Sequence, residues 1–345
     1  MPALVYNRKN AREDKMRYRN LGSSGLKVSE ISLGSWISFH NADDMEMPEK
    51  IIDRAYELGI NFFDTANGYH EGNAEAILGR ALSKFPRESY VIATKVYWPV
   101  GTGSNDGGLS RKHIFSQVEN SLKRLQVDYI DLYYCHWFDS GTPLEETLRA
   151  MDDLVKRGVI RYYGVSNWTA AQIAYGLRAV ERYRLYGITA NQPSYSVLDR
   201  YIESEVIPLC ALEGIGQVVY SPLAQGVLTG KYSLSGEAPV GSRALNPLAK
   251  GRVSIRDFLA DPVLKCADKL KAVAEESGLT LTEMSLAWVL RNPVIASALV
   301  GASSPSQIEI NTKTSGIILS EETIGLIDRV LEENPFHLKH NIVPW

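Results

Sequence analysis

The chain repeats one pattern along most of its length: a short apolar run stops abruptly, and an amphipathic stretch with helical spacing follows. We expect the apolar runs to be strands that end near Ser35, Asp64, Lys95, His136, Ser166, Gln192, Tyr220 and Val300. The first seven ends are 26 to 41 residues apart, which is the pace of βα units. The last gap is 80 residues, because a long loop and two predicted helices, at about 263–277 and 282–292, precede the eighth strand.

Eight strands alternating with helices predict a single (β/α)8 TIM barrel, with extra helices before and after strand eight. A small N-terminal hairpin is also expected, because Arg17–Leu21 and Lys27–Ser29 flank a Gly-Ser-Ser-Gly turn. The structural alternative is a doubly wound sheet. That fold would need a G-x-G-x-x-G turn after the first strand, and Leu33-Gly34-Ser35-Trp36-Ile37 does not supply one.

The domain boundaries follow from the same pattern. Residues 1–16 are polar and mixed in charge, with no apolar stripe, and are predicted to form a flexible extension. Residues 17–345 show no composition shift that marks a linker, and they are expected to form one barrel domain. Of the helices, we predict one from Asn73 to Phe85 and another from Pro143 to Arg157. The latter has Thr142 as its cap, Pro143 at its first position and Gly158 after its end.

Composition excludes several classes of function. The formal charge of −3 and the pI near 6.1 leave no basic footprint for nucleic acid or an anionic membrane. No apolar run approaches the roughly 20 residues needed to span a bilayer, and residues 1–16 lack the apolar core of a signal peptide. Cys135, Cys210 and Cys266 have no paired spacing, which argues against a disulfide framework or a metal site. We therefore expect a cytoplasmic protein.

Ionisable side chains stand at the ends of three successive predicted strands. Asp64 ends the second strand, with Tyr69 in the loop that follows, and Lys95 and His136 end the third and fourth. Taken singly, each has an ordinary explanation: a turn cap, a gap-filling tyrosine, a surface lysine and a core histidine. Together they are hard to explain by packing, because active sites of parallel barrels lie at this rim.

This set of side chains can donate a proton to a developing alkoxide. A tyrosine with a pKa near ~10 is a poor acid at neutral pH unless its phenolate is stabilised. A lysine ammonium within ~4–6 Å lowers that pKa, and an aspartate behind the lysine holds it in place. A neutral histidine can hydrogen-bond and orient the carbonyl oxygen. Because these groups supply no electrons, they imply a hydride donor.

The motifs of this chain resemble those of the aldo-keto reductases. The resemblance runs from about Arg17 to Asp328 and is carried by Asp64-Thr65-Ala66…Tyr69, Thr94-Lys95, His136, Gly164-Val165-Ser166-Asn167-Trp168 and Ser221-Pro222-Leu223-Ala224…Gly226…Thr229-Gly230-Lys231-Tyr232. It is closest to the branch that contains the potassium-channel β subunits and their bacterial reductase relatives. It implies NADPH-dependent reduction of aldehydes and ketones, with Tyr69 as proton donor and Asp64, Lys95 and His136 completing a catalytic tetrad. The mammalian channel subunits have asparagine where His136 stands, so this histidine favours an ordinary reductase.

The resemblance also implies the cofactor contacts. Those near the nicotinamide are Gly34, Ser35, Trp36, Asp64, Ser166, Asn167, Gln192 and Tyr220; those near the pyrophosphate are Ser221, Pro222, Leu223, Gly226 and Lys231; those near the adenosine are Gly301, Ser303, Gln307 and Asn311. Arg243 matches an arginine that reaches the 2′-phosphate, which favours NADP over NAD because a guanidinium suits a phosphate. The chain departs from the family at Ile310, where a glutamate is usual near the adenine, and at His70, where glycine often follows the tyrosine.

Two other functions stay open at this point. One is a nicotinamide-sensing regulatory subunit that docks on a channel or other partner; the other is an NAD(P)-linked polyol or sugar dehydrogenase, because the same tetrad runs in both directions. The expected partner is a small carbonyl compound, with no nucleic acid and no membrane. Homo-oligomerisation is open, since relatives range from monomers to octamers. Trp98, Trp137 and Trp168 follow strands three to five and could line a substrate pocket or only pack loops.

Overall fold

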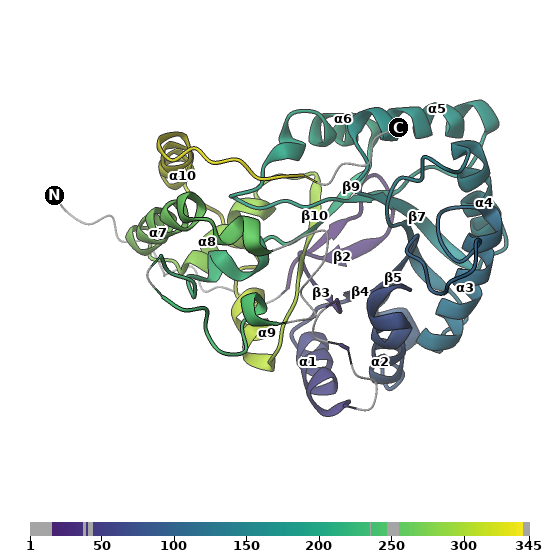
Figure 1. The fold of residues 1–345 in the computed structure, drawn as a ribbon, viewed down its shortest axis with the longest axis horizontal. Helices are drawn as coiled ribbons and strands as arrows, with labels where there is room; N and C mark the ends of the chain where they lie inside the picture. Colours follow the sequence, from purple (N-terminus) through teal and green to yellow (C-terminus); the bar gives the residue numbers. More distant parts are fainter. Residues whose placement is uncertain (1–15, 37–38, 41–43, 235, 247–254, 341–345) are drawn as a thin grey trace.

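Eight parallel strands close into a barrel in which β3 and β10 are neighbours (Figure 1). The computed structural model describes residues 16–36, 39–40, 44–234, 236–246 and 255–340. The barrel strands, in order around it, are β3 (Ile31–Gly34), β4 (Phe62–Asp64), β5 (Val91–Val96), β6 (Ile130–Cys135), β7 (Ile160–Ser166), β8 (Ala190–Gln192), β9 (Gly216–Tyr220) and β10 (Ile295–Val300). The barrel and the strand ends predicted from the sequence are confirmed, the ends to within one residue.

The predicted hairpin is formed by β1 (Tyr18–Asn20) and β2 (Lys27–Ser29), which pair antiparallel. Leu21 and Val28 are fully buried and share an apolar cluster with Phe62 and Val91, which begin β4 and β5. The hairpin therefore covers the end of the barrel at which the strands begin. The opposite end, where polar residues follow the strands, is left for a site.

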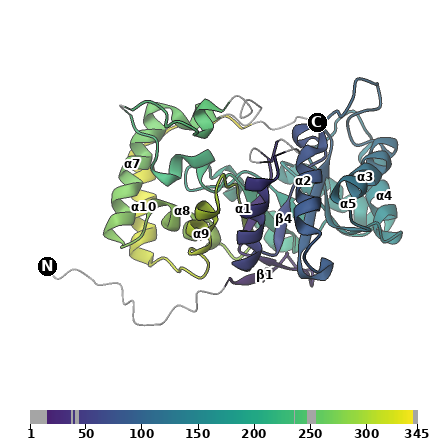
Figure 2. The ribbon, with the colours of Figure 1, turned by 90° about the horizontal axis from the view of Figure 1, so that it is seen from below.

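Helices surround the barrel and cover the outer faces of its strands. They are α1 (Glu46–Glu57), α2 (Asn73–Leu82), α3 (Arg111–Leu125), α4 (Leu144–Lys156), α5 (Ala170–Tyr183), α6 (Val206–Glu213), α7 (Asp261–Glu276), α8 (Leu281–Leu290), α9 (Pro305–Thr312) and α10 (Glu321–Glu333). The extra helices predicted around strand eight are thus present: α7 and α8 precede β10, and α9 and α10 follow it. Figures 1 and 2 place α7 and α10 together, on the side opposite α3 and α4.

The cap predicted for α4 is wrong. Pro143, not Thr142, occupies the N-cap position, and the helix begins at Leu144. The Thr142 hydroxyl donates instead to Asp139 Oδ2 at 2.7 Å, within the preceding loop. Gly158 follows the helix in the left-handed region, at φ +71°, as the sequence predicted.

The two ends of the predicted barrel domain are only partly described. The extension predicted over residues 1–16 lies outside the described residues except for Met16. Met16 is 6% exposed and belongs to the main core cluster, so the packed part of the chain begins one residue earlier than predicted.

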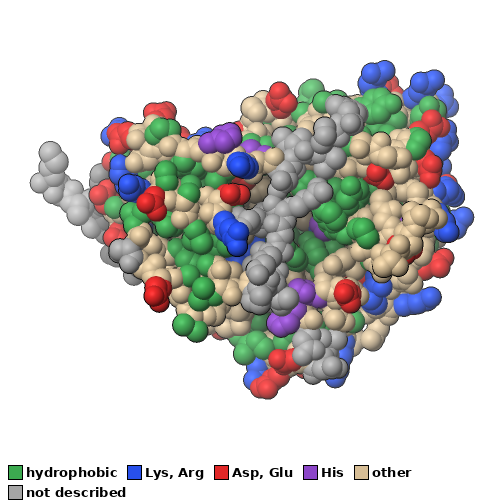
Figure 3. All heavy atoms as spheres, viewed as in Figure 1, with side chains coloured by type: hydrophobic (Ala, Val, Ile, Leu, Met, Phe, Trp, Pro, Cys, Tyr) green, Lys and Arg blue, Asp and Glu red, His purple; other side chains and the backbone are tan. Residues whose placement is uncertain are grey.

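The surface carries charges of both signs. Acidic and basic side chains are interspersed around the rim of the face seen in Figure 3. In the ranges that the structure describes, none of the helices has both the length and the apolar character needed to cross a membrane.

Candidate active site

Three of the four predicted catalytic side chains meet at one ammonium group. Lys95 Nζ donates to Asp64 Oδ1, to the Thr65 carbonyl at 2.7 Å and to the Tyr69 hydroxyl at 3.4 Å. Lys95 and Asp64 are 0% and 1% exposed, so this ion pair is fully buried. The His136 ring stands edge-on to the Tyr69 ring, with 5.7 Å between their centres. The structure therefore brings the predicted tetrad together at the barrel mouth.

The pKa values of the tetrad are governed by burial. Burial raises the pKa of Asp64 and lowers that of Lys95, and their mutual attraction opposes both shifts. Burial, and then Lys95, lower the pKa of His136 well below its usual value, so the imidazole is neutral at pH 7. The pKa of Tyr69 is raised well above its usual value, first by burial and then by the Asp64 charge, while Arg243 lowers it.

One expectation about Tyr69 is therefore wrong for this structure. The sequence predicted that the neighbouring ammonium of Lys95 would lower the pKa of the tyrosine. Burial raises the pKa instead, the Asp64 carboxylate adds to the rise, and the opposing charge is that of Arg243.

A chain of hydrogen bonds runs from the tetrad along the neighbouring strand ends. Gln192 Nε2 donates to Asp64 Oδ2 at 2.8 Å, and the Gln192 carbonyl accepts from Ser166 Oγ at 2.8 Å. Asn167 Nδ2 donates to Ser166 Oγ at 2.9 Å, and Asn167 Oδ1 accepts from the Tyr220 hydroxyl at 2.8 Å. The residues expected to contact the nicotinamide on β7, β8 and β9 thus form one connected set.

The turn that carries Tyr69 has an unusual backbone. His70, Glu71 and Gly72 follow it with φ of +49°, +58° and +91°, a conformation that is unfavourable for the first two. His70 Nε2 lies 2.6 Å from the Trp36 carbonyl, which ties this turn to the loop after β3. A glycine would adopt the His70 conformation without strain, so the departure noted at this position is accommodated by a tertiary contact.

Aromatic rings flank the tetrad on the β5 and β6 side. The Trp98 ring centre lies 6.3 Å from that of His136 and 6.0 Å from that of Trp137. Trp168 is 2% exposed and packs edge-on against Phe138 at 5.1 Å. Trp98 and Trp137 are therefore placed to border the site, whereas Trp168 packs a loop.

The segment after β9 is a turn with a left-handed backbone. Ser221, Ala224, Gln225 and Gly226 all have positive φ, and the N–H groups of Ala224 and Gly226 donate within the turn, to the carbonyls of Ser221 and Leu223 at 2.8 Å. A Cβ on Gly226, whose φ is +102°, would lie 3.1 Å from Lys231 Cε and 3.2 Å from Lys231 Nζ. The glycine therefore lets the ammonium of Lys231 lie against this turn.

Arg243 faces the barrel mouth. Its guanidinium lies 4.7 Å from the centre of the Trp36 ring, and burial lowers its pKa to about 10. Burial, and then the charge of Arg243, lower the pKa of Lys231, so the two cations are close enough to repel. Within the described part of the chain, Arg243 Nε and Nη2 are buried and meet no hydrogen-bond acceptor. Two orphaned donors beside a second cation fit a phosphate-bearing ligand.

The residues predicted to contact the adenosine lie at the start of α9. Ser303 N donates to Gln307 Oε1 at 3.0 Å, and Gln307 Nε2 donates to Ser303 Oγ at 3.1 Å. Asn311 is buried, Ile310 is 46% exposed, and Gly301 lies at the surface. Among the described residues, no hydrogen bond joins this group to Arg243, whose predicted partner is the 2′-phosphate and not these side chains.

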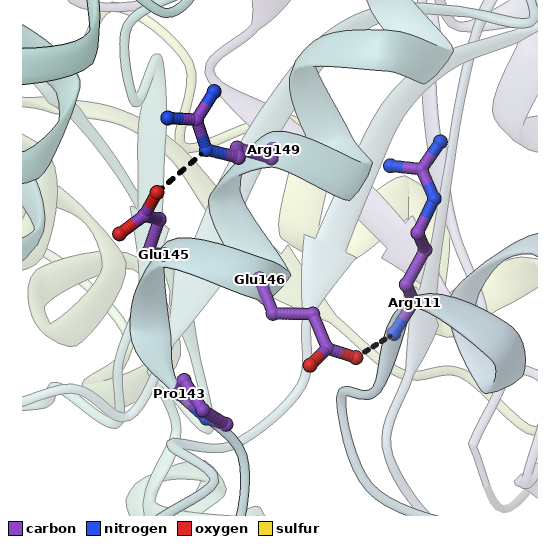
Figure 4. A pocket seen from close by; sticks show the side chains of 5 residues that line it. All are labelled: Arg111, Pro143, Glu145, Glu146 and Arg149. Carbon is purple, nitrogen blue, oxygen red and sulfur yellow. Dashed lines mark hydrogen bonds and ion pairs between the residues drawn. The ribbon is translucent and has the colours of Figure 1, made fainter.

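A separate surface pocket of about 350 Å³ lies at the starts of α3 and α4 (Figure 4). It is lined by Arg111, Pro143, Glu145, Glu146 and Arg149. Its charged side chains have partners: Arg149 Nε lies 2.8 Å from Glu145 Oε1, Arg111 Nη1 lies 2.6 Å from Asp153 Oδ2, and Glu146 Oε1 accepts from the Arg111 backbone at 2.9 Å. It contains none of the predicted site residues, so the chemistry is not assigned to it.

Two residues of the site escaped the sequence interpretation. Thr65 contributes only its carbonyl, which holds Lys95, and no side-chain signal marks such a role. Gln225 is 5% exposed, and in the described structure neither polar atom of its amide has a partner. A polar residue enclosed by Ala224 and Gly226 in an otherwise apolar stretch was a usable signal for it.

Comparison with known proteins gives consistent matches. The profile of the Aldo/keto reductase family matches residues 30–332. A probable voltage-gated potassium channel subunit beta of Arabidopsis thaliana is 42% identical over 325 residues, which is 93% of this chain and 98% of the relative. The rice protein of the same name is 40% identical over the same shares of the two chains. A putative voltage-gated potassium channel subunit beta of Schizosaccharomyces pombe is 37% identical over 94% of this chain and 95% of its own.

Proposed function

The chain belongs to the aldo/keto reductase family, and from this premise we propose that it reduces aldehydes and ketones with NADPH. Membership of the family makes it an oxidoreductase. The observation that supports carbonyl reduction is that Asp64 and Tyr69 both contact the buried ammonium group of Lys95.

In this proposal Tyr69 is the proton donor. A bound dihydronicotinamide supplies the hydride that the carbonyl carbon receives. Tyr69 gives its hydroxyl proton to the carbonyl oxygen, and the phenolate left behind then accepts a charge-assisted hydrogen bond from Lys95. The raised pKa of Tyr69 keeps its proton in place until the oxygen becomes basic. His136, neutral because burial lowers its pKa, orients the carbonyl without adding a charge.

The residues that would hold the cofactor divide into two groups. Ser166, Asn167, Gln192 and Tyr220 would contact the nicotinamide end, and the turn after β9 with Lys231 would contact the pyrophosphate. Arg243 would bind the 2′-phosphate, which is the basis for proposing NADPH rather than NADH. Among the described residues its Nε and Nη2 have no acceptor while the guanidinium rests on Trp36, and these two free donors support that role.

A second function is favoured by the names of the relatives. Three relatives at 37–42% identity are described as probable or putative potassium channel subunits beta. A regulatory subunit that senses nicotinamide and docks on a partner is therefore the alternative. It would bind NADPH tightly and turn over slowly, whereas a metabolic reductase releases its product quickly.

The test compares Tyr69→Phe with Tyr186→Phe, which changes a tyrosine at the outer surface. A panel of aldehydes is assayed with NADPH at saturating cofactor. We expect Tyr69→Phe to lower kcat by about 10²–10⁴-fold, the usual range for loss of a general acid, with NADPH affinity unchanged. The control should match wild type. Turnover by Tyr69→Phe near the wild-type rate would refute the assignment of the proton donor.

We propose a cytoplasmic protein, supported by three cysteines that are buried and unpaired. Its proposed partner is a small carbonyl compound, and the net charge of −3 offers no argument for nucleic acid. Whether copies of the chain associate is a question for light scattering.

A further inference from the structure

A buried carboxylate lies behind the tetrad and is not part of it. Glu75, on α2, is 0% exposed. Its Oε1 accepts from Thr94 Oγ1 at 2.5 Å, and its Oε2 accepts from Arg124 Nε at 2.6 Å. A buried charge is unfavourable unless it is paired and hydrogen-bonded, and both oxygens of this carboxylate are used. We therefore ask what this buried, fully hydrogen-bonded carboxylate contributes to the neighbouring candidate site.

The first partner connects Glu75 to the strand that carries Lys95. Thr94 and Lys95 are adjacent on β5, so their side chains point to opposite faces of the strand. Lys95 faces the ion pair with Asp64, and Thr94 faces outward to α2 and Glu75. The carboxylate therefore fixes the end of β5 from the outer face.

The second partner connects Glu75 to the turn that carries Tyr69. That turn ends at Gly72, and a Cβ there would lie 2.7 Å from Cδ and Nε of Arg124. The start of the same loop is also held by α3, because Asn67 Nδ2 donates to Gln117 Oε1 at 3.2 Å. Arg124 and Gln117 thus brace the loop around Tyr69 at its two ends.

We propose that Glu75 and Arg124 are positioning residues that set the separation between the Lys95 ammonium and the Tyr69 hydroxyl. The inference rests on the proposed reductase function. It assigns no contact with substrate to either residue: Glu75 acts through Thr94, and Arg124 acts through the backbone at Gly72. The strand end that carries Lys95 and the turn that carries Tyr69 are therefore both held by the Glu75–Arg124 ion pair, which lies outside the barrel strands.

The pair has an electrostatic consequence that packing alone would not have. The Glu75 charge raises the pKa of Lys95, which opposes the lowering by burial. Removal of that charge should therefore lower the pKa of Lys95. The ammonium would then be lost at a lower pH, and the alkaline limb of the activity profile should move to lower pH.

The matched control is Asp131→Asn. Asp131 is likewise a buried carboxylate, paired with Arg87 at 2.6 Å, and it accepts from Ile92 N on the same strand β5 at 2.8 Å. It differs from Glu75 in lying toward the other end of β5 from Lys95. Glu75→Gln and Asp131→Asn therefore each remove one buried charge held against β5, and only the first should affect the site.

The experiment measures kcat, KM and the pH profile of NADPH-dependent aldehyde reduction by wild type, Glu75→Gln and Asp131→Asn. We expect Glu75→Gln to lower kcat about 10- to 100-fold with KM within about twofold, because small misplacements of reacting groups have effects of this size. Its alkaline limb should move to lower pH, and Asp131→Asn should retain the wild-type profile. If Glu75→Gln does not fold, Glu75→Gln combined with Arg124→Gln removes both charges and takes its place.

A second readout does not depend on turnover. The ammonium resonance of Lys95 is followed by NMR against pH, with assignment by Lys95→Met. A lower titration midpoint in Glu75→Gln, with no change in Asp131→Asn, supports the inference even if wild type reduces no aldehyde. That result would refute the proposed reductase function but not the effect of Glu75 on Lys95. The positioning role is overturned if wild type is active and both variants, Glu75→Gln and Asp131→Asn, have the same pH profile of activity and the same Lys95 titration midpoint.

Discussion

Arg243 rests on Trp36, with 4.7 Å between its guanidinium and the centre of the indole ring. Both residues were expected to contact the cofactor, but at opposite ends of it. The contact joins a residue near the nicotinamide to one assigned to the 2′-phosphate. Among the described residues, Arg243 Nε and Nη2 meet no acceptor while the guanidinium rests on the ring, and a phosphate would supply one.

Replacement of Arg243 by alanine should remove the preference for NADPH. A hydrogen bond to a charged group contributes about 1.5–3 kcal/mol, so the Kd for NADPH should rise about 10- to 150-fold. Fluorescence titration with both dinucleotides measures this, and Arg243→Lys should retain part of the preference because it keeps a charge. Because the guanidinium pKa is about 10, the expected preference of wild type should hold through pH 9. Equal wild-type affinities for NADPH and NADH would contradict the assignment.

Loss of one member of the Asp64–Lys95 pair should destabilise the fold strongly. Lys95→Met leaves a buried carboxylate without its cation, and breaking such a pair reduces the free energy of unfolding by about 3–5 kcal/mol. The double variant, Asp64→Asn with Lys95→Met, should be less destabilised than the sum of the two single variants. Urea unfolding of the four proteins measures the coupling. Additive losses would mean that the two charges do not stabilise each other.

His136 should make the protein sensitive to mild acid. Its folded-state pKa is below the usual value, so the unfolded chain binds the proton more readily. Its contribution to stability is therefore complete above about pH 6.5, the ordinary histidine pKa, and is lost as the pH falls toward the lower folded value. His136→Asn should flatten the dependence of unfolding free energy on pH between 7 and 5. An unchanged slope would show that His136 is protonated equally in both states.

Gly226→Ala should be destabilising, whereas Gly187→Ala should be nearly neutral. Gly226 has φ +102°, and an added Cβ would lie 3.1 Å from Lys231 Cε; a Cβ on Gly187 would have no heavy atom within 4 Å. The strained backbone predicts a loss of about 1–3 kcal/mol for Gly226→Ala by urea unfolding. Weaker pyrophosphate binding should accompany it, because the displaced side chain is Lys231. Equal stabilities of the two variants would exclude strain at this turn.

Most of the fold could be read from the sequence, because each parallel strand is buried and ends where polar residues begin. Asp64, Ser166, Gln192 and Tyr220 end their strands as predicted, since their side chains cannot continue into the apolar wall. The α4 cap could not be predicted locally. Thr142 has the right residue type, but Asp139 takes its hydroxyl in the folded loop.

The candidate site was less predictable, for reasons of electrostatics and loop placement. The tetrad was found because its members sit at strand ends, and strand ends converge in a barrel. The pKa of Tyr69 depends on how deeply the ring is buried and on how near the charges of Asp64 and Arg243 lie, and the sequence gives neither. Glu75 looks like an ordinary acidic residue in the first turn of a helix, and nothing in the periodicity shows that it is buried.

The closure of the barrel between β3 and β10 also affects how the chain folds during its synthesis. Ser297 Oγ donates to the Ser29 carbonyl, 268 residues away in the sequence, and β10 pairs with β3 along Ile31–Leu33. Contacts between such distant segments form late and slow the search for the native state. During synthesis the N-terminal strands therefore emerge long before β10 is available to cover the open edge of β3. Until then that edge is unpaired, and an unpaired strand edge can pair with another chain.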